Sequence, residues 1–210
     1  MSINFFDTPR EFVLIERVDE VPQKKNIHVF AICVTSDNIP LVATRRVSFA
    51  FHGIMAKNKH FSTSQVVNIS NELLKYMYNN ELKEICVRLK NNKIDINNNF
   101  EEIILMGGKL DKSETIKECL YREIQEESDH MFSIKYIKDN FLKVTIVDKL
   151  FNKSYIGYCT ICYIEENIKT ILSKILYNVE VMGIKSLFDC KNNDKYNYLY
   201  FIYNTLINSK

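Results

Sequence analysis

Apolar runs near the N-terminus predict β-strands. Segments 12–18 (FVLIERV) and 28–36 (HVFAICVTS) are rich in β-branched and aromatic residues, and segment 39–51 (IPLVATRRVSFAF) has the same character. Pro40 stands at the start of the third segment, where a missing N–H is tolerated in a strand. We therefore expect three strands in this part of the chain.

The hydrophobic period changes in the segment 62–93. Apolar residues there recur at spacings of three and four, in one set over 66–77 and a second set over 82–89. The polar pair Asn79-Asn80 separates the two sets. The pattern predicts two helices inserted between strands.

The rest of the chain alternates between strands and helices. The segment 100–108 is predicted to be a strand that ends in glycines, and a helix follows with Ser113 as its expected N-cap. Further expected elements are strands at 132–137, 141–148, 154–164 and 178–187 and a helix at 194–208. This order predicts a single α/β or α+β domain over 1–210, with a helical insertion at about 62–93.

Composition is that of an ordinary globular domain. The chain has 210 residues, 46% of them hydrophobic, and a formal net charge of +2, which alone gives no argument for nucleic-acid binding. No apolar run reaches the length of a membrane span, and the N-terminus lacks the layout of a secretory signal. The six cysteines do not form the paired motifs of a zinc site, so we expect buried, reduced thiols.

The segment 107–130 (GGKLDKSETIKECLYREIQEESDH) places acids on one side of a helix. Glu123, Glu126 and Glu127 are three and four positions apart, so they project from the same face. Like charges at this spacing repel each other by roughly a few tenths of a kcal/mol per pair. A divalent cation would compensate this repulsion, and carboxylate oxygens suit Mg²⁺ or Mn²⁺.

Neighbouring residues strengthen the metal-site interpretation. Gly107 and Gly108 allow the backbone to approach a ligand closely, and the carbonyl of Gly108 would add a further oxygen ligand. Arg122 is placed to hold either Glu126, four positions later, or Glu114 in one rotamer. The plainer interpretation is a solvated acidic helix with one salt bridge, but it does not account for the strand, the glycines and the spacing together.

The run from Gly108 to Glu127 follows the pattern G-x5-E-x7-R-E-U-x-E-E and so resembles the Nudix box, here 108–129. The resemblance implies an α/β/α sandwich with a mixed sheet, and hydrolysis of a nucleoside diphosphate linked to another group. The residues with implied catalytic or metal-binding roles are Gly108, Arg122, Glu123, Glu126 and Glu127. Glu126 or Glu127 would be the general base, and the other would be a ligand together with Glu123.

The chain departs from the Nudix pattern at one end of the box. The usual glycine after the last glutamates is replaced by Asp129, and the apolar position after it is His130. These positions close the helix and do not bind metal. The departure therefore concerns the C-terminal turn of the helix and leaves the chemistry intact.

A closer resemblance extends from about residue 7 to the C-terminus. The segments TPREF, HVFAICVTSD, RRVSFAF, DKLFNKSYIGYC and DKYNYLYFIYN are similar to the poxvirus mRNA-decapping Nudix enzymes, of the shorter of their two kinds. This family implies hydrolysis of the 7-methylguanosine cap of viral and host mRNA, which releases 7-methylguanosine diphosphate and RNA with a 5′ monophosphate. It also implies Mg²⁺ or Mn²⁺ as cofactor and capped mRNA as partner. We expect a monomer in the cytoplasm of the infected host cell, without a membrane or an obligate protein partner.

The family-like segments contain residues suited to a methylated guanine. Phe51 and Tyr155 would stack on the cationic base, and Glu11 and Asp148 would accept hydrogen bonds from its edge. Each has a plainer interpretation: core packing for Phe51, which shares the predicted strand face of Phe49, and surface or turn positions for the others. Asp148 would alternatively lie near the metal as an extra acid.

Basic residues outside the box are candidates for phosphate contacts. Arg45 and Arg46 precede the proposed cap residue Phe51, and they would meet cap phosphates or serve only as strand-edge charges. Four more basic residues lie on the predicted inserted helices: Lys83, Arg88, Lys90 and Lys93. The default interpretation is that they form a solvated face. The more specific hypothesis is that this face binds the RNA beyond the cap.

Two other functions fit parts of the sequence. One is a Nudix hydrolase of free nucleotides or dinucleoside polyphosphates, which would not require the inserted helices. The other is a non-catalytic module that binds capped RNA, and the intact set of carboxylates argues against it.

Overall fold

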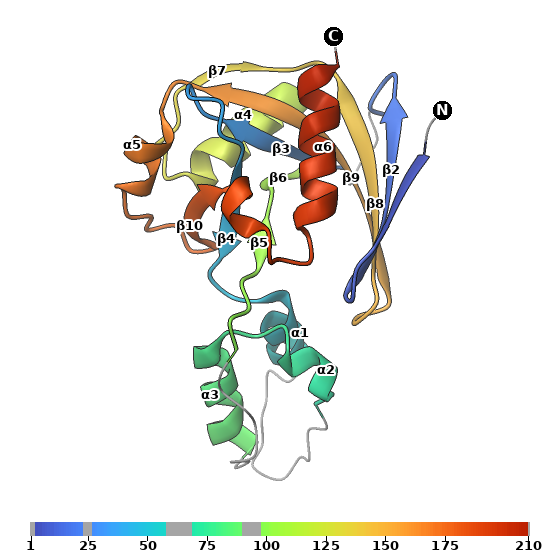
Figure 1. Cartoon of the computed structure of the whole chain (residues 1–210), viewed down its shortest axis with the longest axis vertical. Coiled ribbons are helices and arrows are strands. Elements are labelled where there is room, and N and C mark those ends of the chain that lie inside the picture. The colour runs from blue at the N-terminus through green and yellow to red at the C-terminus, as the bar shows by residue number, and fades with distance from the viewer. Residues whose placement is uncertain (1–2, 23–26, 58–68, 90–97, 210) are drawn as a thin grey trace. The chain divides into compact units, whose positions relative to one another are not determined.

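The computed structural model describes residues 3–22, 27–57, 69–89 and 98–209. The chain divides into two compact units, one of residues 1–44 with 103–210 and the other of residues 45–102. We call them the sheet unit and the helical unit and describe each by itself (Figure 1). The predicted catalytic segment belongs to the sheet unit.

A mixed sheet, seven-stranded within the described ranges, forms the frame of the sheet unit. Its strands are β1 (Ile3–Asp7), β2 (Glu11–Val18), β3 (His28–Val34), β6 (Met106–Lys109), β7 (Ile134–Ile137), β8 (Phe141–Asp148) and β9 (Lys153–Ile164). The order is β1-β2-β8-β9-β3-β6, with β7 also paired to β9. The central pair β3–β9 is parallel, and the other pairings among these strands are antiparallel.

A smaller sheet and four helical segments complete the sheet unit as far as the structure describes it. The smaller sheet has the order β10 (Val181–Ser186), β4 (Leu41–Arg45) and β5 (Ile103–Ile104). The helical segments are α4 (Ile116–Glu127), α5 (Ile168–Leu172), a 3₁₀ turn η1 (Leu187–Cys190) and α6 (Tyr196–Asn208). None of the helices in the described ranges has the length and apolarity that crossing a membrane requires.

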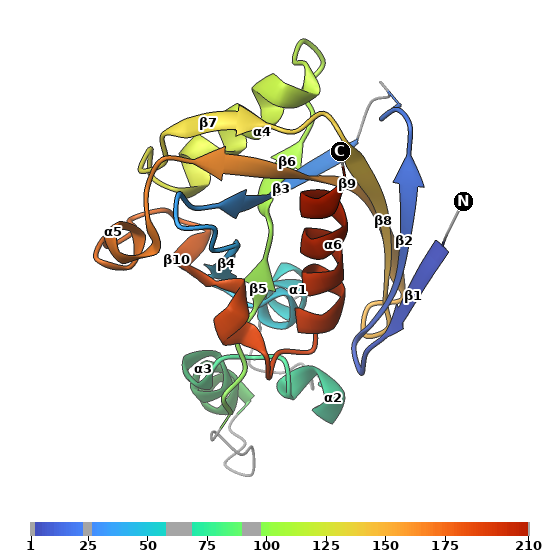
Figure 2. The same ribbon diagram turned by 45° about the horizontal axis from the view of Figure 1, so that its top comes forward.

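Helices α4 and α6 cover opposite faces of the large sheet (Figure 2). Because side chains alternate along a strand, β3 sends Val29 and Ala31 to the core beneath α4 and Ile32 and Val34 to the core beneath α6. Apolar residues on both strand faces explain why β3 reads as a continuous hydrophobic run. The result is the mixed α/β arrangement that the sequence predicts.

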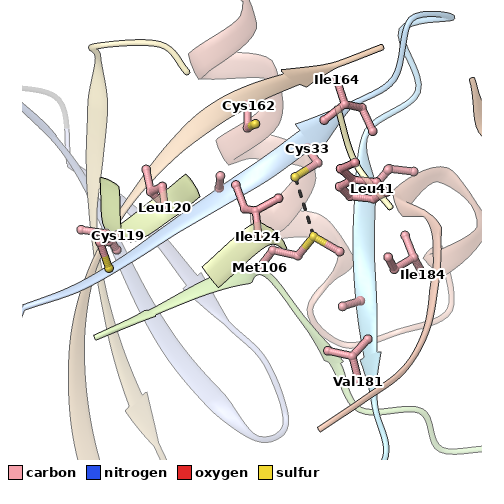
Figure 3. Close-up of a cluster of buried hydrophobic side chains, with 14 of the residues drawn as sticks. Cys33, Leu41, Met106, Cys119, Leu120, Ile124, Cys162, Ile164, Val181 and Ile184 are labelled. Atoms are coloured by element: carbon pink, nitrogen blue, oxygen red, sulfur yellow. Dashed lines mark hydrogen bonds between the residues drawn. The ribbon is translucent and has the colours of Figure 1, made fainter. Parts of the chain in front are cut away.

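All six cysteines lie in the described ranges, and they are buried and free of disulfides. Cys159 and Cys162 lie on opposite faces of β9, in the α6-side and α4-side cores respectively, so their spacing cannot form a metal-binding pair. In the α4-side core the Cys33 sulfur is 3.7 Å from the Met106 sulfur (Figure 3). A hydrogen bond with Cys162 and burial raise the pKa of Cys33 well above its ordinary value. These findings confirm the expectation of buried, reduced thiols.

Helix α4 begins two residues later than predicted. The predicted N-cap was Ser113, but the structure places Thr115 there, where its hydroxyl accepts a hydrogen bond from the Glu118 N–H at 3.3 Å. The Glu118 carboxylate in turn accepts the Thr115 N–H at 2.7 Å. This reciprocal capping box satisfies two backbone donors of the first turn, which a single cap at Ser113 would not.

The helical unit contains α1 (Phe49–Lys57), α2 (Asn71–Leu74) and α3 (Asn79–Leu89). Helices α2 and α3 lie within the predicted insertion, while residues 58–68 and 90–97 of this part of the chain lie outside the described ranges. The extent of the insertion and the single-domain organisation stay predictions.

The prediction of one strand over 39–51 is wrong beyond Arg45. The Ser48 hydroxyl accepts a hydrogen bond from the Phe51 N–H at 3.0 Å, which caps the first turn of α1. Ser48 is itself held by the buried Glu81, whose carboxylate accepts its N–H at 2.8 Å and its hydroxyl at 2.7 Å. The cap therefore depends on a residue 33 positions away, so the local strand-like composition gave the wrong result.

Replacing Gly107 with Ala tests how closely β6 packs on β3. Gly107 has a φ of 138°, and an added Cβ would lie 2.2 Å from the Val29 carbonyl oxygen. Because that oxygen belongs to backbone, we expect Gly107→Ala to lower the free energy of unfolding by about 2 kcal/mol or more in urea titrations. Gly183→Ala is the control, since its nearest atom would be the Thr44 hydroxyl at 3.4 Å. Equal stability of the two variants would contradict this account of the strand pair.

Candidate active site

Two glycines in β6 bring the backbone against two acids of α4. The Gly107 N–H donates a hydrogen bond to Glu127 Oε2 at 2.9 Å. An added Cβ at Gly108 would lie 2.4 Å from the carboxyl carbon of Glu123, so this carboxylate rests directly on the glycine backbone. The spacing of four residues on α4 thus lets two carboxylates converge on the glycine pair.

Arg122 joins three acids of the box in one ion-pair network. It donates to both oxygens of Glu114, from Nε at 2.6 Å and from Nη2 at 3.0 Å. Its Nη1 donates to Glu123 Oε1 at 2.8 Å and lies 3.5 Å from Glu126 Oε2. Of the two partners that the sequence offered for Arg122, Glu114 is therefore held in the bidentate geometry and Glu126 only weakly.

The network fixes the charges of Glu114 and Arg122. Hydrogen bonds from Arg122 lower the pKa of Glu114 to about 2, and the bonds to Glu114 and Glu123 raise the pKa of Arg122 above its ordinary value. Glu114 is therefore ionised throughout the neutral range. Three carboxylates share one guanidinium, so the cluster keeps a net negative charge that suits a cation.

The donor atoms at this site are of the type that binds a divalent metal. Within the described ranges, no three His, Cys, Asp or Glu side chains stand close enough together to hold a metal ion as they are. Glu123, Glu126 and Glu127 nevertheless share one face of α4, with Glu123 against the Gly108 backbone and Glu127 bonded to the Gly107 N–H. Hard oxygen ligands are what Mg²⁺ and Mn²⁺ prefer. The Glu126 side chain is 55% exposed, so it has room to change rotamer towards the other two.

The departure at Asp129 has a structural explanation. Asp129 and His130 have φ values of 50° and 56°, so both residues adopt the left-handed conformation that glycine usually supplies there. The Asp129 carboxylate accepts the backbone N–H groups of Tyr177 and Asn178, and the Asn178 side-chain amide donates to the Glu126 carbonyl at 2.8 Å. Asp129 therefore links the segment at Tyr177 and Asn178 to the end of α4. The sequence indicated only that a glycine is absent at this position.

The sheet brings three of the four predicted cap residues together. Glu11 on β2 is paired directly with Asp148 on β8, and Tyr155 on β9 is paired with Ile146, two residues from Asp148. Directly paired antiparallel residues lie on the same face, so Glu11, Asp148 and Tyr155 share the face that α6 covers. The Tyr155 side chain is 49% exposed, whereas both acids are buried.

Both buried acids have identifiable partners that the sequence analysis missed. Asp148 Oδ1 accepts the N–H groups of Leu150 and Phe151 at 2.8 and 3.1 Å, and Arg10 lies 3.4 Å from Oδ2. For Glu11, Tyr198 donates to Oε2 at 2.8 Å, and Lys195 Nζ lies 3.5 Å from Oε1. The side-chain partners Arg10, Tyr198 and Lys195 are 138 or more positions away from their acids, so no local pattern indicated them.

The charges of Asp148 and Arg10 affect the pKa of Tyr155. Burial raises its pKa above the ordinary value, the negative charge of Asp148 raises it further, and the positive charge of Arg10 opposes the shift. The Tyr155 hydroxyl is therefore protonated at neutral pH.

Phe51, the fourth predicted cap residue, lies in α1 of the helical unit and not on a strand. It is half-buried. Phe49 no longer shares its face, because residues two apart on a helix point in different directions. The pairing of Phe51 with Tyr155 joins two separately described units and stays a prediction.

The predicted basic contacts have mixed surroundings. The Arg45 guanidinium lies over the Phe49 ring, 4.2 Å from its centroid, and Arg46 is exposed. On α3, Lys83 is exposed and Arg88 forms an ion pair with Glu84 one turn earlier. Lys90 and Lys93 lie outside the described residues.

Comparison with known proteins places the chain in a family. No protein-family model matches it. It is 54% identical to the mRNA-decapping protein D9 of Rabbit fibroma virus, over 98% of each chain, and 50% identical to the mRNA-decapping protein OPG121 of Monkeypox virus, over 98% of this chain and 95% of that protein. The fowlpox virus protein FPV054, described by its name as a Nudix hydrolase, is 44% identical over 98% of this chain and 89% of its own length. The chain therefore belongs to the poxvirus mRNA-decapping family of Nudix hydrolases, as the resemblance of its motifs predicts.

Proposed function

We propose that this protein removes the 7-methylguanosine cap from viral and host mRNA in the cytoplasm of the infected cell. Water attacks a phosphorus of the cap, a new P–O bond forms, and a phosphoanhydride bond breaks. The products are 7-methylguanosine diphosphate and RNA with a 5′ monophosphate. The observation that carries the proposal is the convergence of Glu123 and Glu127 on Gly107 and Gly108 in a chain of the decapping family.

The acids of α4 perform the catalytic work in this proposal. A divalent cation, Mg²⁺ or Mn²⁺, when bound supplies positive charge to the diphosphate oxygens and lowers the pKa of the attacking water. The side chains of Glu123, Glu126 and Glu127 and the Gly108 carbonyl would hold it. Glu126 or Glu127 takes the proton of the attacking water as general base.

Arg122 acts on the orientation of these acids. Its bidentate bond with Glu114 fixes the guanidinium, and the remaining nitrogen then fixes Glu123 against Gly108. Glu126 is only weakly held at 3.5 Å, which leaves it able to move during the reaction. In this network Glu123 is therefore held rigidly, whereas Glu126 can change its side-chain conformation.

Residues outside the Nudix box recognise the methylated base in this proposal. Methylation makes guanine cationic, and each aromatic ring stacked on it contributes about 1–3 kcal/mol. Tyr155 and Phe51 are the proposed rings, and Glu11 or Asp148 accepts the N–H groups of the guanine edge. Tyr155 has the exposure that stacking requires and lies on the same sheet face as both acids.

Replacement of the catalytic acids tests the active site. Glu126→Gln and Glu127→Gln each remove a negative ligand or the base, so the rate of cap release from labelled RNA with Mg²⁺ should fall at least about 100-fold. Glu118→Gln on the same helix is the control, because Gln preserves the capping box and the rate should stay near that of the parent. Near-normal turnover by either of the first two variants would refute the assignment.

Removal of each ring tests cap recognition. Phe51→Ala and Tyr155→Ala should raise KM for capped RNA and reduce the preference for the methylated over the unmethylated cap, because a cationic base gains most from stacking. The turnover at saturation should change less than KM. Tyr136→Ala removes another exposed ring of the sheet unit and serves as the control. Unchanged methyl preference in both test variants would place the cap elsewhere.

Neutral replacement of the basic residues tests the RNA track. We expect Gln at Lys83, Arg88, Lys90 and Lys93 to weaken binding of long capped RNA and to flatten its salt dependence by about one unit of slope per lost phosphate contact. Turnover at saturating RNA should be unaffected. An unchanged slope would return these residues to the solvated-face interpretation.

A further inference from the structure

Glu11 is a buried carboxylate whose partners come from the opposite end of the chain. It is the first residue of β2 and only 5% exposed. The first turn of α6 lies towards the end of the sheet where the β1–β2 and β8–β9 hairpins turn (Figure 1). From there Tyr198 and Lys195 reach the carboxylate, 187 and 184 positions away in sequence.

Each oxygen of this carboxylate has its own partner in α6. Tyr198 donates its hydroxyl to Oε2 at 2.8 Å, and Lys195 Nζ lies 3.5 Å from Oε1. Lys195 is itself anchored, because Nζ also donates to the Ile103 carbonyl at 3.1 Å. A carboxylate can accept about four hydrogen bonds. These contacts use two of the four, as far as the described residues go.

Asp148 is held in a different way. Leu150 and Phe151 of its own hairpin donate to Oδ1, and Arg10 lies 3.4 Å from Oδ2, so one of its two oxygens is held by local backbone. Within the described residues, the Glu11 carboxylate is contacted by Tyr198 of α6 and by Lys195 immediately before that helix. The direction in which Glu11 presents its remaining acceptor sites therefore depends on α6.

We propose that Tyr198 and Lys195 are positioning residues that fix the Glu11 carboxylate for recognition of the guanine edge. This inference rests on the proposed decapping function. With two acceptor sites occupied from α6, the remaining two match the N1–H and N2–H donors that guanine offers side by side. The C-terminal helix, on the sheet face opposite the catalytic helix, thereby contributes to the choice of base.

Binding of nucleotides without metal tests this role directly. The probes are 7-methylguanosine diphosphate and 7-methylinosine diphosphate, which lacks only the 2-amino group, measured by titration calorimetry. We expect Tyr198→Phe and Lys195→Met each to weaken binding of the guanosine compound about tenfold, because the first removes a hydrogen bond to the Glu11 carboxylate and the second removes its ion-pair partner. Binding of the inosine compound should weaken less, so the ratio of the two affinities should narrow.

Two further variants separate positioning from general damage. Tyr203→Phe removes a hydroxyl from another buried tyrosine of α6 and should leave the affinity ratio unchanged. In a Glu11→Gln background, Tyr198→Phe should have little additional effect on the ratio, because the carboxylate it positions is already absent. Thermal unfolding of every variant establishes that the comparison is made between folded proteins.

The outcomes are distinct. If the parent distinguishes the two compounds and both α6 variants distinguish them equally well, or lose affinity for both in equal measure, positioning by α6 is refuted. If the parent itself does not bind 7-methylguanosine diphosphate, or does not prefer it to the inosine compound, the proposed cap recognition fails and this inference fails with it.

Discussion

The close approach of α4 to β6 is the constraint on which the active site depends. Gly107 has a backbone conformation that side chains rarely allow, and Gly108 lies where a Cβ would overlap the carboxyl group of Glu123. Only with both side chains absent can the helix deliver Glu123 and Glu127 onto the same short stretch of backbone. The glycines therefore matter because they have no side chain. The space left free allows the acids of the box to approach the backbone of β6.

Arg122 is the electrostatic counterpart of this steric arrangement. Acids gathered on one helix face repel each other, and a guanidinium shared by Glu114, Glu123 and, weakly, Glu126 offsets part of that repulsion without metal. The pKa of Glu114, lowered to about 2, reflects the strength of this pairing. Three carboxylates around one guanidinium leave the cluster with an excess of acidic groups, as the proposed cation site requires.

Local patterns predicted much of this fold. The bounds predicted for strands β2, β8 and β9 agree with the observed bounds to within one residue, and the N-cap of α4 lies two residues later than predicted. The strand prediction failed after Arg45, where the start of α1 depends on Ser48 and the distant Glu81. A composition rich in aromatic and β-branched residues cannot reveal a cap of that kind.

The site residues show the same difference between what local patterns predict and what long-range contacts determine. The acids proposed to be catalytic lie on one helix, so their spacing alone predicted a common face, whereas the placement of the proposed cap residues Glu11, Asp148 and Tyr155 depends on strand register. The direct pairing of Glu11 with Asp148 follows from the β2–β8 alignment, and the support of Glu11 by α6 follows from packing across the sheet. Neither is encoded in a short motif, and both required the three-dimensional structure.

The most direct test of the central claim is the identity of the product released from cap-labelled RNA with Mg²⁺ or Mn²⁺, compared with hydrolysis of free dinucleoside polyphosphates. We expect the label to be released as 7-methylguanosine diphosphate, the RNA to retain a 5′ monophosphate, and free dinucleoside polyphosphates to be poor substrates. Efficient hydrolysis of the free nucleotides without release of the cap would contradict it.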